Sequence, residues 1–378
     1  MDTELTDQVW NIPAQHRAAQ ILSGAVGRQD LGHAWAFVGP PDVGQQQAAR
    51  AFAADANGAL GDPVLTGRFM RGAHPAYQEF VPVGAFHRVD DVKGRWLQAA
   101  NQTVKEGRVK VLRIVAADLM NLNAANAFLK ALEEPPQGTV WILDLADPDE
   151  VPDTILSRCR VVTFAPWNRE ELAKLADNLG LTGIDGQVAV RAAMGSPTTL
   201  RRLVGPQALS DYRTHRSWLV DVHAQGPGYA LRASRALKDE LGRRAKVIAA
   251  QDQQELEELT ELYGDTPPRP VLKDHEARYK RLGRAEQTET VQRALDDVVG
   301  WCRDVLVVGG GGNTEGVRNV DALEQLRQHA EMVSAGALLD ICDQALYTRE
   351  AIEVNVRWDL AVEAFLLGAH ARSLQKTP

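Results

Sequence analysis

The segment 39–46 has the spacing of a loop that binds the phosphates of ATP. Its glycines, Gly39 and Gly44, fit the pattern G-x-x-x-x-G-K-[ST]. In a working loop the lysine neutralises phosphate oxygens, and the hydroxyl that follows it holds magnesium. Here those two positions hold Gln45 and Gln46, whose amides carry no charge. The sequence therefore predicts a degenerate loop, no bound cofactor, and ATP binding that is weak at most.

The acidic half of such a site is also missing from its expected place. In ATPases of this kind an Asp-Glu pair at a strand end binds magnesium and polarises the attacking water. The strand expected over 109–116 ends in Val115 and Ala116, and the first carboxylate is Asp118, which we interpret as a helix-start or surface residue. Asp42 adds negative charge inside the loop. Because the lysine, the hydroxyl and both acids are lost together, we expect neither a metal site nor hydrolysis here.

Alternation of apolar runs with helical stretches over residues 1–165 predicts the elements that position this loop. The pattern is typical of a doubly wound α/β module, a parallel sheet covered by helices on both faces. Strands are expected at 34–38, 77–83, 109–116, 139–145 and 160–164, and helices at 45–56, 89–106 and 124–133.

The rest of the chain shows only helical signals. Short helices at 167–178, 186–194 and 198–204 predict a small helical lid domain over residues 166–205. From residue 206 to 378 we expect an all-α domain of long helices, with turns at 264–268 and 309–313. The four glycines at 309–312 lack a preceding strand and a following lysine, so we interpret them as a helix connector. Within this domain Val291, Leu295, Val298, Cys302 and Val305 form a stripe typical of a helix core.

Composition excludes several classes of protein. The chain has 378 residues, and 42 basic against 50 acidic side chains give a net charge of −8, so any contact with DNA must be local. Apolar stretches are too short to span a membrane. The first ten residues carry three acids where a secretory signal needs positive charge and an apolar run. Three widely spaced cysteines are expected to be reduced, and we expect a cytoplasmic protein.

Several segments together resemble the clamp-loader subunits of bacterial DNA polymerase III, a family with the AAA+ fold, and most closely its delta-prime members. The similarity runs from about Trp10 to Leu367 and is thin between 205 and 271. The segments that carry it are NAFLKALEEPP at 126–136, DP at 147–148, PDTILSRCR at 152–160, HAW at 33–35 before GPP at 39–41, GAHP at 72–75, NVR at 355–357 and LAVE at 360–363.

The resemblance implies a role for Arg158, which stands between Ser157 and Cys159. In the family this arginine projects into the ATP site of a neighbouring subunit, where its guanidinium stabilises charge on the transferred phosphoryl group. Arg158 would thus be an arginine finger that acts in trans. The alternative is a surface ion pair with a carboxylate. Cys159 is expected to be a small buried hydrophobe rather than a nucleophile.

The resemblance also implies partners: the gamma/tau and delta subunits, the sliding clamp, directly or through other subunits, and primer–template DNA through the assembled complex. The helices after residue 205 would join a helical collar that holds the subunits together. Lys130, Arg201 and Arg202 are candidates for phosphate contacts, although solvated helix faces explain them equally well.

The chain departs from the family at three further positions. The sensor threonine would align with Leu145 or Ala146, and the lid arginine would align near Thr198. The four cysteines that hold zinc in many delta-prime members are absent from 56–73, and His74 is interpreted as a strand-entry residue. The sequence thus favours a non-catalytic subunit. An ATP-hydrolysing gamma/tau-type subunit and an AAA+-like scaffold outside replication remain the alternatives.

Overall fold

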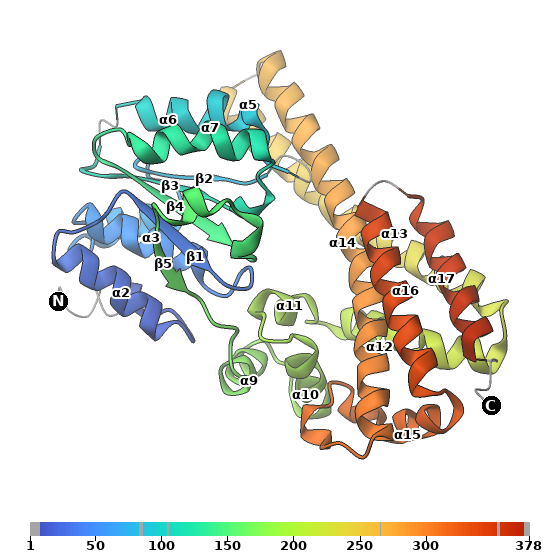
Figure 1. Cartoon of the computed structure of the whole chain (residues 1–378). Coiled ribbons are helices and arrows are strands. Elements are labelled where there is room, and N and C mark those ends of the chain that lie inside the picture. The colour runs from blue at the N-terminus through green and yellow to red at the C-terminus, as the bar shows by residue number, and fades with distance from the viewer. Residues whose placement is uncertain (1–7, 83–85, 104–105, 265, 354–355, 374–378) are drawn as a thin grey trace. The chain divides into compact units, whose positions relative to one another are not determined.

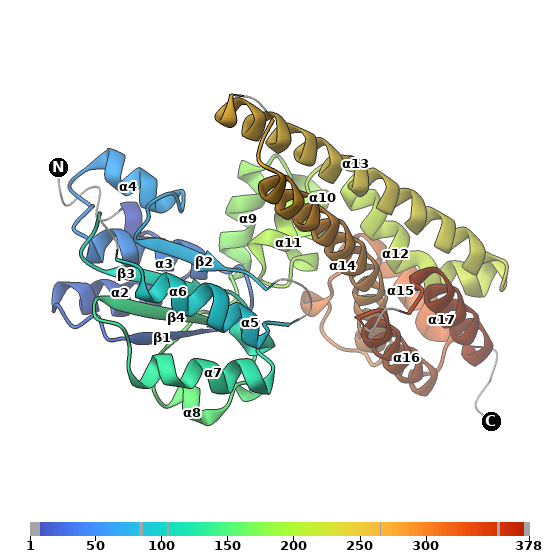
Figure 2. The same ribbon diagram turned by 90° about the horizontal axis from the view of Figure 1, so that it is seen from above.

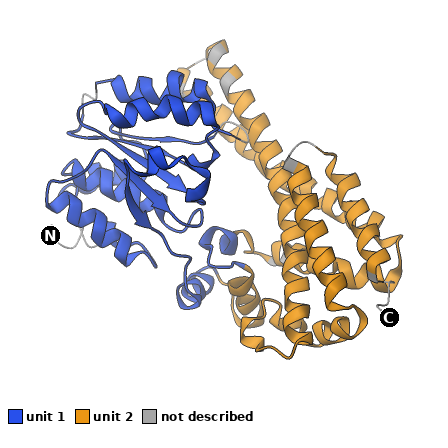
Figure 3. Cartoon of the chain, in the orientation of Figure 1, with its two compact units in different colours: residues 1–179, 193–201 blue, residues 180–192, 202–378 orange. Residues whose placement is uncertain are grey.

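The computed structural model describes residues 8–82, 86–103, 106–264, 266–353 and 356–373. The chain divides into two compact units (Figure 3): unit 1 holds residues 1–179 and 193–201, and unit 2 holds residues 180–192 and 202–378. The region 166–205 contributes to both units. Its separation as a lid domain between domains 1–165 and 206–378 stays a prediction.

Five parallel strands form the sheet of unit 1, in the order β2-β3-β4-β1-β5 (Figure 1). Each coincides with one of the predicted apolar runs, and the doubly wound α/β class is confirmed. The bounds are β1 Ala34–Val38, β2 Tyr77–Phe80, β3 Lys110–Ile114, β4 Thr139–Leu145 and β5 Arg160–Thr163.

Helices cover both faces of this sheet because successive strand side chains point to opposite sides. In β1, Trp35 and Phe37 pack with one set of helices, and Ala34 and Ala36 pack with the other. The first face carries α2 His16–Gly27, α3 Gln45–Ala56 and α4 Pro63–Met70. The second carries α5 Val89–Asp91, a π-helical turn Val92–Trp96, α6 Leu97–Asn101, α7 Leu122–Glu133 and α8 Asp153–Leu156.

The helix predicted over 89–106 ends earlier, at Asn101. The cause is Lys110 at the start of β3, a buried lysine whose ammonium group donates to the carbonyls of Ala99 and Ala100, each at 2.7 Å, and to that of Gln102. These are the carbonyls that a helix end leaves without intrahelical partners. A buried ammonium thus caps the helix and fixes its last residue.

The helices after the sheet also follow the prediction. α9 Arg169–Asn178 lies in unit 1, α10 Gly183–Ala192 lies in unit 2, and α11 Pro197–Arg202 spans the boundary between them. Unit 2 continues with α12 Pro206–Gln225, α13 Tyr229–Tyr263, α14 Arg269–Gly309, α15 Leu323–Met332, α16 Ala335–Glu353 and α17 Trp358–Ser373 (Figures 1 and 2).

The core of unit 2 contains the stripe expected on α14. Val291, Leu295, Val298, Cys302 and Val305 are all fully buried among residues of the neighbouring helices. The predicted turns fall where α13 and α14 end. Gly264 follows α13 in the left-handed conformation, and Gly310–Gly312 follow α14, with Gly311 at a φ of 69°. Among the residues described, no helix has the length and apolarity needed to cross a membrane.

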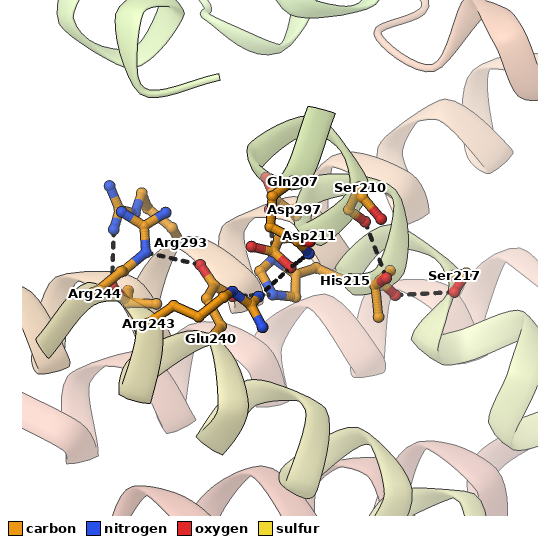
Figure 4. Close-up of polar contacts among 12 residues, drawn as sticks. Gln207, Ser210, Asp211, His215, Ser217, Glu240, Arg243, Arg244, Arg293 and Asp297 are labelled. Carbon is orange, nitrogen blue, oxygen red and sulfur yellow. Dashed lines mark hydrogen bonds and ion pairs between the residues drawn. The ribbon is translucent and has the colours of Figure 1, made fainter. Parts of the chain in front are cut away.

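A buried ionic cluster joins three helices of unit 2 (Figure 4). His215 of α12 lies between Glu240 of α13 and Asp297 of α14, with nitrogen–oxygen distances of 3.0 Å to each carboxylate. Burial by itself would lower the pKa of His215, but the hydrogen bonds and charges of Asp297 and Glu240 raise it to about 9. The imidazolium is thus the stable form in the folded unit at neutral pH.

This cluster predicts that the stability of the protein falls as the pH rises from about 6.5 to about 9. Since the pKa of His215 is higher in the folded state, its contribution is complete below about pH 6.5 and disappears as the pH passes the folded value. The shift corresponds to about 3 kcal/mol. Urea unfolding of the wild type and of His215→Gln at pH 6.5 and pH 9 measures it. Equal pH dependence in the two proteins would contradict the assignment.

Candidate nucleotide loop and candidate arginine finger

The loop between β1 and α3 approaches its neighbours closely through its backbone. The N–H of Gly39 donates to the carbonyl of Leu145 at 2.9 Å, and a Cβ on Gly39 would lie 2.0 Å from the carbonyl oxygen of Phe164. Only glycine fits such an approach. Gly44 has a φ of 136°, and its carbonyl begins α3 by accepting from Ala48 at 2.9 Å. Both glycines of the motif therefore have structural reasons for their positions.

The side chain of Gln45 folds back into the loop and is buried. Its Oε1 accepts from the N–H of Val43 at 2.9 Å, and its Nε2 donates to the carbonyl of Pro40 at 2.6 Å. In phosphate-binding loops, backbone N–H groups such as that of Val43 serve the ligand. In this chain a neutral amide from the lysine position accepts the N–H bond instead.

Two side chains from outside the loop bind the carbonyl of the same residue, Val43. Nε2 of Gln15 and Nε1 of Trp167 donate to the carbonyl of Val43 at 3.1 and 2.8 Å. Gln15 also exchanges two hydrogen bonds with the backbone of Ala165, at 2.7 and 3.1 Å. Val43 is thus bonded through its N–H to Gln45 and through its carbonyl to Gln15 and Trp167, so the peptide groups on both sides of this residue are held in place.

A buried ion network lies at the carboxyl ends of three strands, on the face covered by α3. The guanidinium of Arg113 in β3 contacts Asp144 of β4 and lies 3.4 Å from Glu79 of β2. Gln46 and Arg50 of α3 reach the same Glu79 at 3.0 and 3.2 Å. The network therefore links the second glutamine of the loop to the sheet.

The charges of this network sit where open α/β sheets usually bind ligands. Burial raises the pKa of Asp144 to about 6, although Arg113 opposes the rise. For Glu79, burial acts to raise the pKa, but the hydrogen bond from Tyr77 and the charge of Arg113 hold it below its usual value. Both carboxylates are engaged by Arg113, a cation of the chain itself. Among the residues described, no group of three or more His, Cys, Asp or Glu side chains could hold a metal ion.

Sequence reasoning missed this network. Arg113 and Asp144 interrupt apolar strands, and such charges in the interior of a parallel sheet are almost always paired. These charges within apolar strands, together with Glu79 on the neighbouring strand, were the sequence signal that could have predicted the network.

The chain beyond β3 holds no acid at the positions expected for magnesium. Ala116 adopts the left-handed conformation with φ 50°, which turns the chain away from the strand. The carboxylate of Asp118 accepts from the N–H groups of Ala146 and Asp147 at 2.9 and 3.0 Å. Asp118 thus ties the end of β3 to the end of β4.

Arg158 lies on the surface of unit 1, just after α8. One guanidinium nitrogen donates to the carbonyl of Thr154 at 2.8 Å, and the other lies 2.8 Å from the carboxylate of Glu133 at the end of α7. Its side chain remains 36% exposed. The surface ion pair that the sequence left open is therefore present, and such an exposed pair contributes about 0–1 kcal/mol.

The residues beside Arg158 shape the turn that presents it. Ser157 follows the last residue of α8, and its hydroxyl donates to the carbonyl of Thr154 at 3.3 Å. Cys159 is half-buried against the sheet core, and burial raises the pKa of its thiol to about 12. A thiol with so high a pKa is a poor nucleophile at neutral pH.

The remaining candidates lie apart from the loop contacts described above. Lys130 and Arg201 are exposed, and Arg202 is paired with Glu289 of α14. His74 stacks on Phe69 with ring centroids 3.9 Å apart, and burial lowers its pKa.

The family that matches this chain covers the residues that form the sheet and the helices packed on it. The family described as "DNA polymerase III, delta subunit" matches residues 14–168, which run from α2 past β5. The delta-prime subunit of DNA polymerase III from Pseudomonas aeruginosa is 33% identical over 192 residues, which cover 47% of this chain and 58% of the relative.

The gamma and tau subunits are related as well. The tau subunit of DNA polymerase III from Bacillus subtilis is 23% identical over 352 residues, which cover 88% of this chain and 56% of the relative. The chain thus spans little more than half the length of these two relatives.

A solved structure also aligns with most of the chain. This DNA polymerase III gamma-subunit-related protein from Thermotoga maritima aligns over 94% of this chain and 99% of its own, with 16% identity and a TM-score of 0.43. The part of the chain that forms the sheet is thus similar to subunits of DNA polymerase III, and both delta-prime and gamma/tau subunits are among the relatives that match.

Proposed function

We propose that this chain is a non-catalytic, delta-prime-type subunit of the DNA polymerase III clamp loader, which supplies Arg158 in trans to the ATP site of a neighbouring subunit. One contrast carries the proposal. Arg158 stands on the surface at the end of α8, while the side chain of Gln45 is hydrogen-bonded inside the chain's own loop.

A guanidinium group such as that of Arg158 is suited to stabilising a phosphoryl group during its transfer. Its charge is permanent and its planar donors match the oxygens of a phosphoryl group, so it stabilises the charge that develops during transfer. To reach a neighbour, Arg158 must leave Glu133, which costs about 1 kcal/mol or less. Contacts with a phosphoryl group would exceed that cost.

The proposal includes the assembly. The neighbours would be gamma/tau and delta subunits, and the helices of unit 2 would form this chain's part of a collar. ATP turnover by the neighbour would drive opening or release of the sliding clamp on primed DNA, with this chain completing a site that belongs to another subunit.

One observation favours an ATP-hydrolysing gamma/tau-type subunit instead. The tau relative aligns over 88% of this chain, against 47% for the delta-prime relative. Such a subunit needs a cation and magnesium ligands at its loop, where this chain has Gln45, Gln46, Val115 and Ala116. Equilibrium binding of labelled ATP to the isolated chain separates the two, because magnesium-dependent binding at micromolar concentration would favour the ATPase.

The third possibility, an AAA+-like scaffold outside replication, is tested by co-purification. A chain that stays monomeric and ignores the polymerase III subunits would favour the scaffold.

The finger is tested by Arg158→Ala in the assembled complex. Loss of the guanidinium should lower the clamp-stimulated ATPase rate by a factor of about 10³, as in other phosphoryl transfers that use an arginine in trans. Arg160→Ala is the matched control, since the Arg160 side chain is 43% exposed against 36% for Arg158 and also forms a surface ion pair, with Asp30 at 2.7 Å. Its rate should stay within about twofold of the wild type. An unchanged rate for Arg158→Ala in an intact assembly refutes the finger.

Glu133→Gln tests whether the ion pair holds the finger back. Release of Arg158 from a surface pair worth about 0–1 kcal/mol should raise the ATPase rate of the complex by up to about fivefold. Glu134→Gln, at the adjacent exposed position, should change nothing. A fall in rate with Glu133→Gln would instead show that Glu133 positions the finger for the reaction.

Gln45→Lys should not create hydrolysis, because the positions of Val115 and Ala116 still leave magnesium unheld. The substitution should also destabilise the protein by about 1–3 kcal/mol, since it removes the acceptor of the Val43 N–H. Gln46→Lys is the control and should be near neutral, because it replaces the hydrogen bond from Gln46 to Glu79 by an ion pair with the same carboxylate. Turnover by the single variant Gln45→Lys would show that the magnesium ligands lie elsewhere in the chain.

A further inference from the structure

The hairpin of α13 and α14 continues beyond the other helices of unit 2, as both views show (Figures 1 and 2). We call its outer part, residues 247–288, the arm. Of the described residues between Glu240 and Thr290, only Pro267 and His275 are buried. Among its described side chains the arm thus shows no buried apolar cluster, and polar contacts between its two helices gain importance.

Polar contacts connect the two helices of the arm. Asp252 of α13 lies 3.4 Å from His275 of α14, and the carboxylate of Glu255 contacts Arg278 and accepts from the hydroxyl of Tyr279 at 2.5 Å. These contacts use acids from α13 and mainly cations from α14. The inner charges of the arm are thus satisfied across the hairpin.

The outer face of α14 carries cations that take no part in these contacts. Arg269, Lys273, Lys280 and Arg284 follow one another at intervals of four, seven and four residues, which places them on one side of a helix. We call these four residues the basic stripe. All four are exposed, and none forms an ion pair with a described carboxylate. Glu276 lies on the same face between Lys273 and Lys280, so this face carries four cations and one acid, and Arg281 flanks it.

The charge of this segment opposes that of the chain. Residues 269–284 contain six basic and two acidic side chains, a net charge of +4, whereas the whole chain carries −8, so the remainder carries −12. Like charges four residues apart destabilise a helix by about 0.2–0.5 kcal/mol per pair. The stripe contains two such pairs, Arg269 with Lys273 and Lys280 with Arg284. A ligand of opposite charge would remove this repulsion.

We propose that the basic stripe binds the phosphate backbone of a nucleic-acid duplex, independently of base sequence. The stripe spans about 22 Å along the helix axis at 1.5 Å per residue. One strand of a duplex carries about six phosphates over that length. Lysine and arginine side chains supply the donors that such contacts use. The inference goes beyond the role of Arg158 and does not depend on it.

An acidic protein partner fits the stripe less well. Protein interfaces usually have an apolar centre, but the positions between the four cations on this face are Glu276 and Ala277, and Gln287 follows at the end of the stripe. The exposed Leu282 lies about half a turn away. On α13, exposed Glu257, Glu258 and Glu261 would repel a polyanion, so a duplex would contact the α14 side of the arm.

Fluorescence anisotropy of a labelled 30-base-pair DNA duplex, titrated with the full chain at 50–200 mM salt, tests the proposal. The wild type should bind with a Kd of about 10⁻⁴–10⁻⁶ M, typical of sequence-independent binding. The variant Arg269→Gln/Lys273→Gln/Lys280→Gln/Arg284→Gln should bind at least about tenfold more weakly at 50 mM salt, and its slope of log K against log salt should flatten by about 3. Glutamine keeps the helix propensity of these positions, which circular dichroism verifies.

The control removes the same charge from unit 1, at exposed arginines that form no ion pair with a described residue: Arg17→Gln/Arg28→Gln/Arg71→Gln/Arg108→Gln. It should bind as the wild type does. Equal losses in both variants would show diffuse attraction and overturn the inference, as would no binding by the wild type at 50 mM salt or full binding by the stripe variant. Sedimentation of the same proteins tests the alternative that the basic stripe binds the acidic side of a second copy of this chain. Self-association that requires the stripe, together with no DNA binding, would support this alternative and overturn the inference.

Discussion

The two hydrogen bonds of Gln45 are the interaction on which the architecture of the loop depends. A chain that passes from a parallel strand into a helix within a few residues brings several peptide groups toward one point at the sheet edge. In phosphate-binding loops an anion satisfies them. Here Oε1 and Nε2 of one buried amide satisfy an N–H and a carbonyl together, so the turn is complete without a ligand. Because a buried peptide group without a partner costs about 1–3 kcal/mol, Gln45 is a structural residue of the loop.

The ion network at the strand ends is also satisfied by groups of the chain itself. At the carboxyl ends of β2, β3 and β4, Arg113 brings its own positive charge between Glu79 and Asp144. Gln46 then joins the network through Glu79. The side chains of Gln46 and Glu79 thus connect the loop to the sheet, and Arg113 offsets the negative charge of Glu79 and Asp144 at the strand ends. Arg158, by contrast, lies on the surface and contacts a half-exposed carboxylate and one carbonyl.

Much of the fold could be predicted from the sequence, because apolar runs bounded by turn residues mark strands and the stripe on α14 marks a core. The end of α6 could not, since it depends on Lys110, whose ammonium reaches back to the helix from the next strand. The loop was recognised by its glycine spacing, yet nothing in that spacing indicates that Gln45 folds inward. Contacts between residues distant in sequence, such as Arg158 with Glu133 or Arg113 with Asp144, depend on tertiary packing and are invisible to local patterns.

The inward fold of Gln45 has a consequence for the history of such a chain. Exchanging it for lysine removes a buried acceptor at once, whereas any catalytic benefit requires a hydroxyl at Gln46 and acids near Val115 as well. Gln46 is itself bonded to Glu79, so its replacement disturbs a second set of contacts. Each intermediate sequence would be less stable than its parent and no more active. Single substitutions toward a phosphate-binding loop would therefore lower the stability of the protein before any of them could support catalysis.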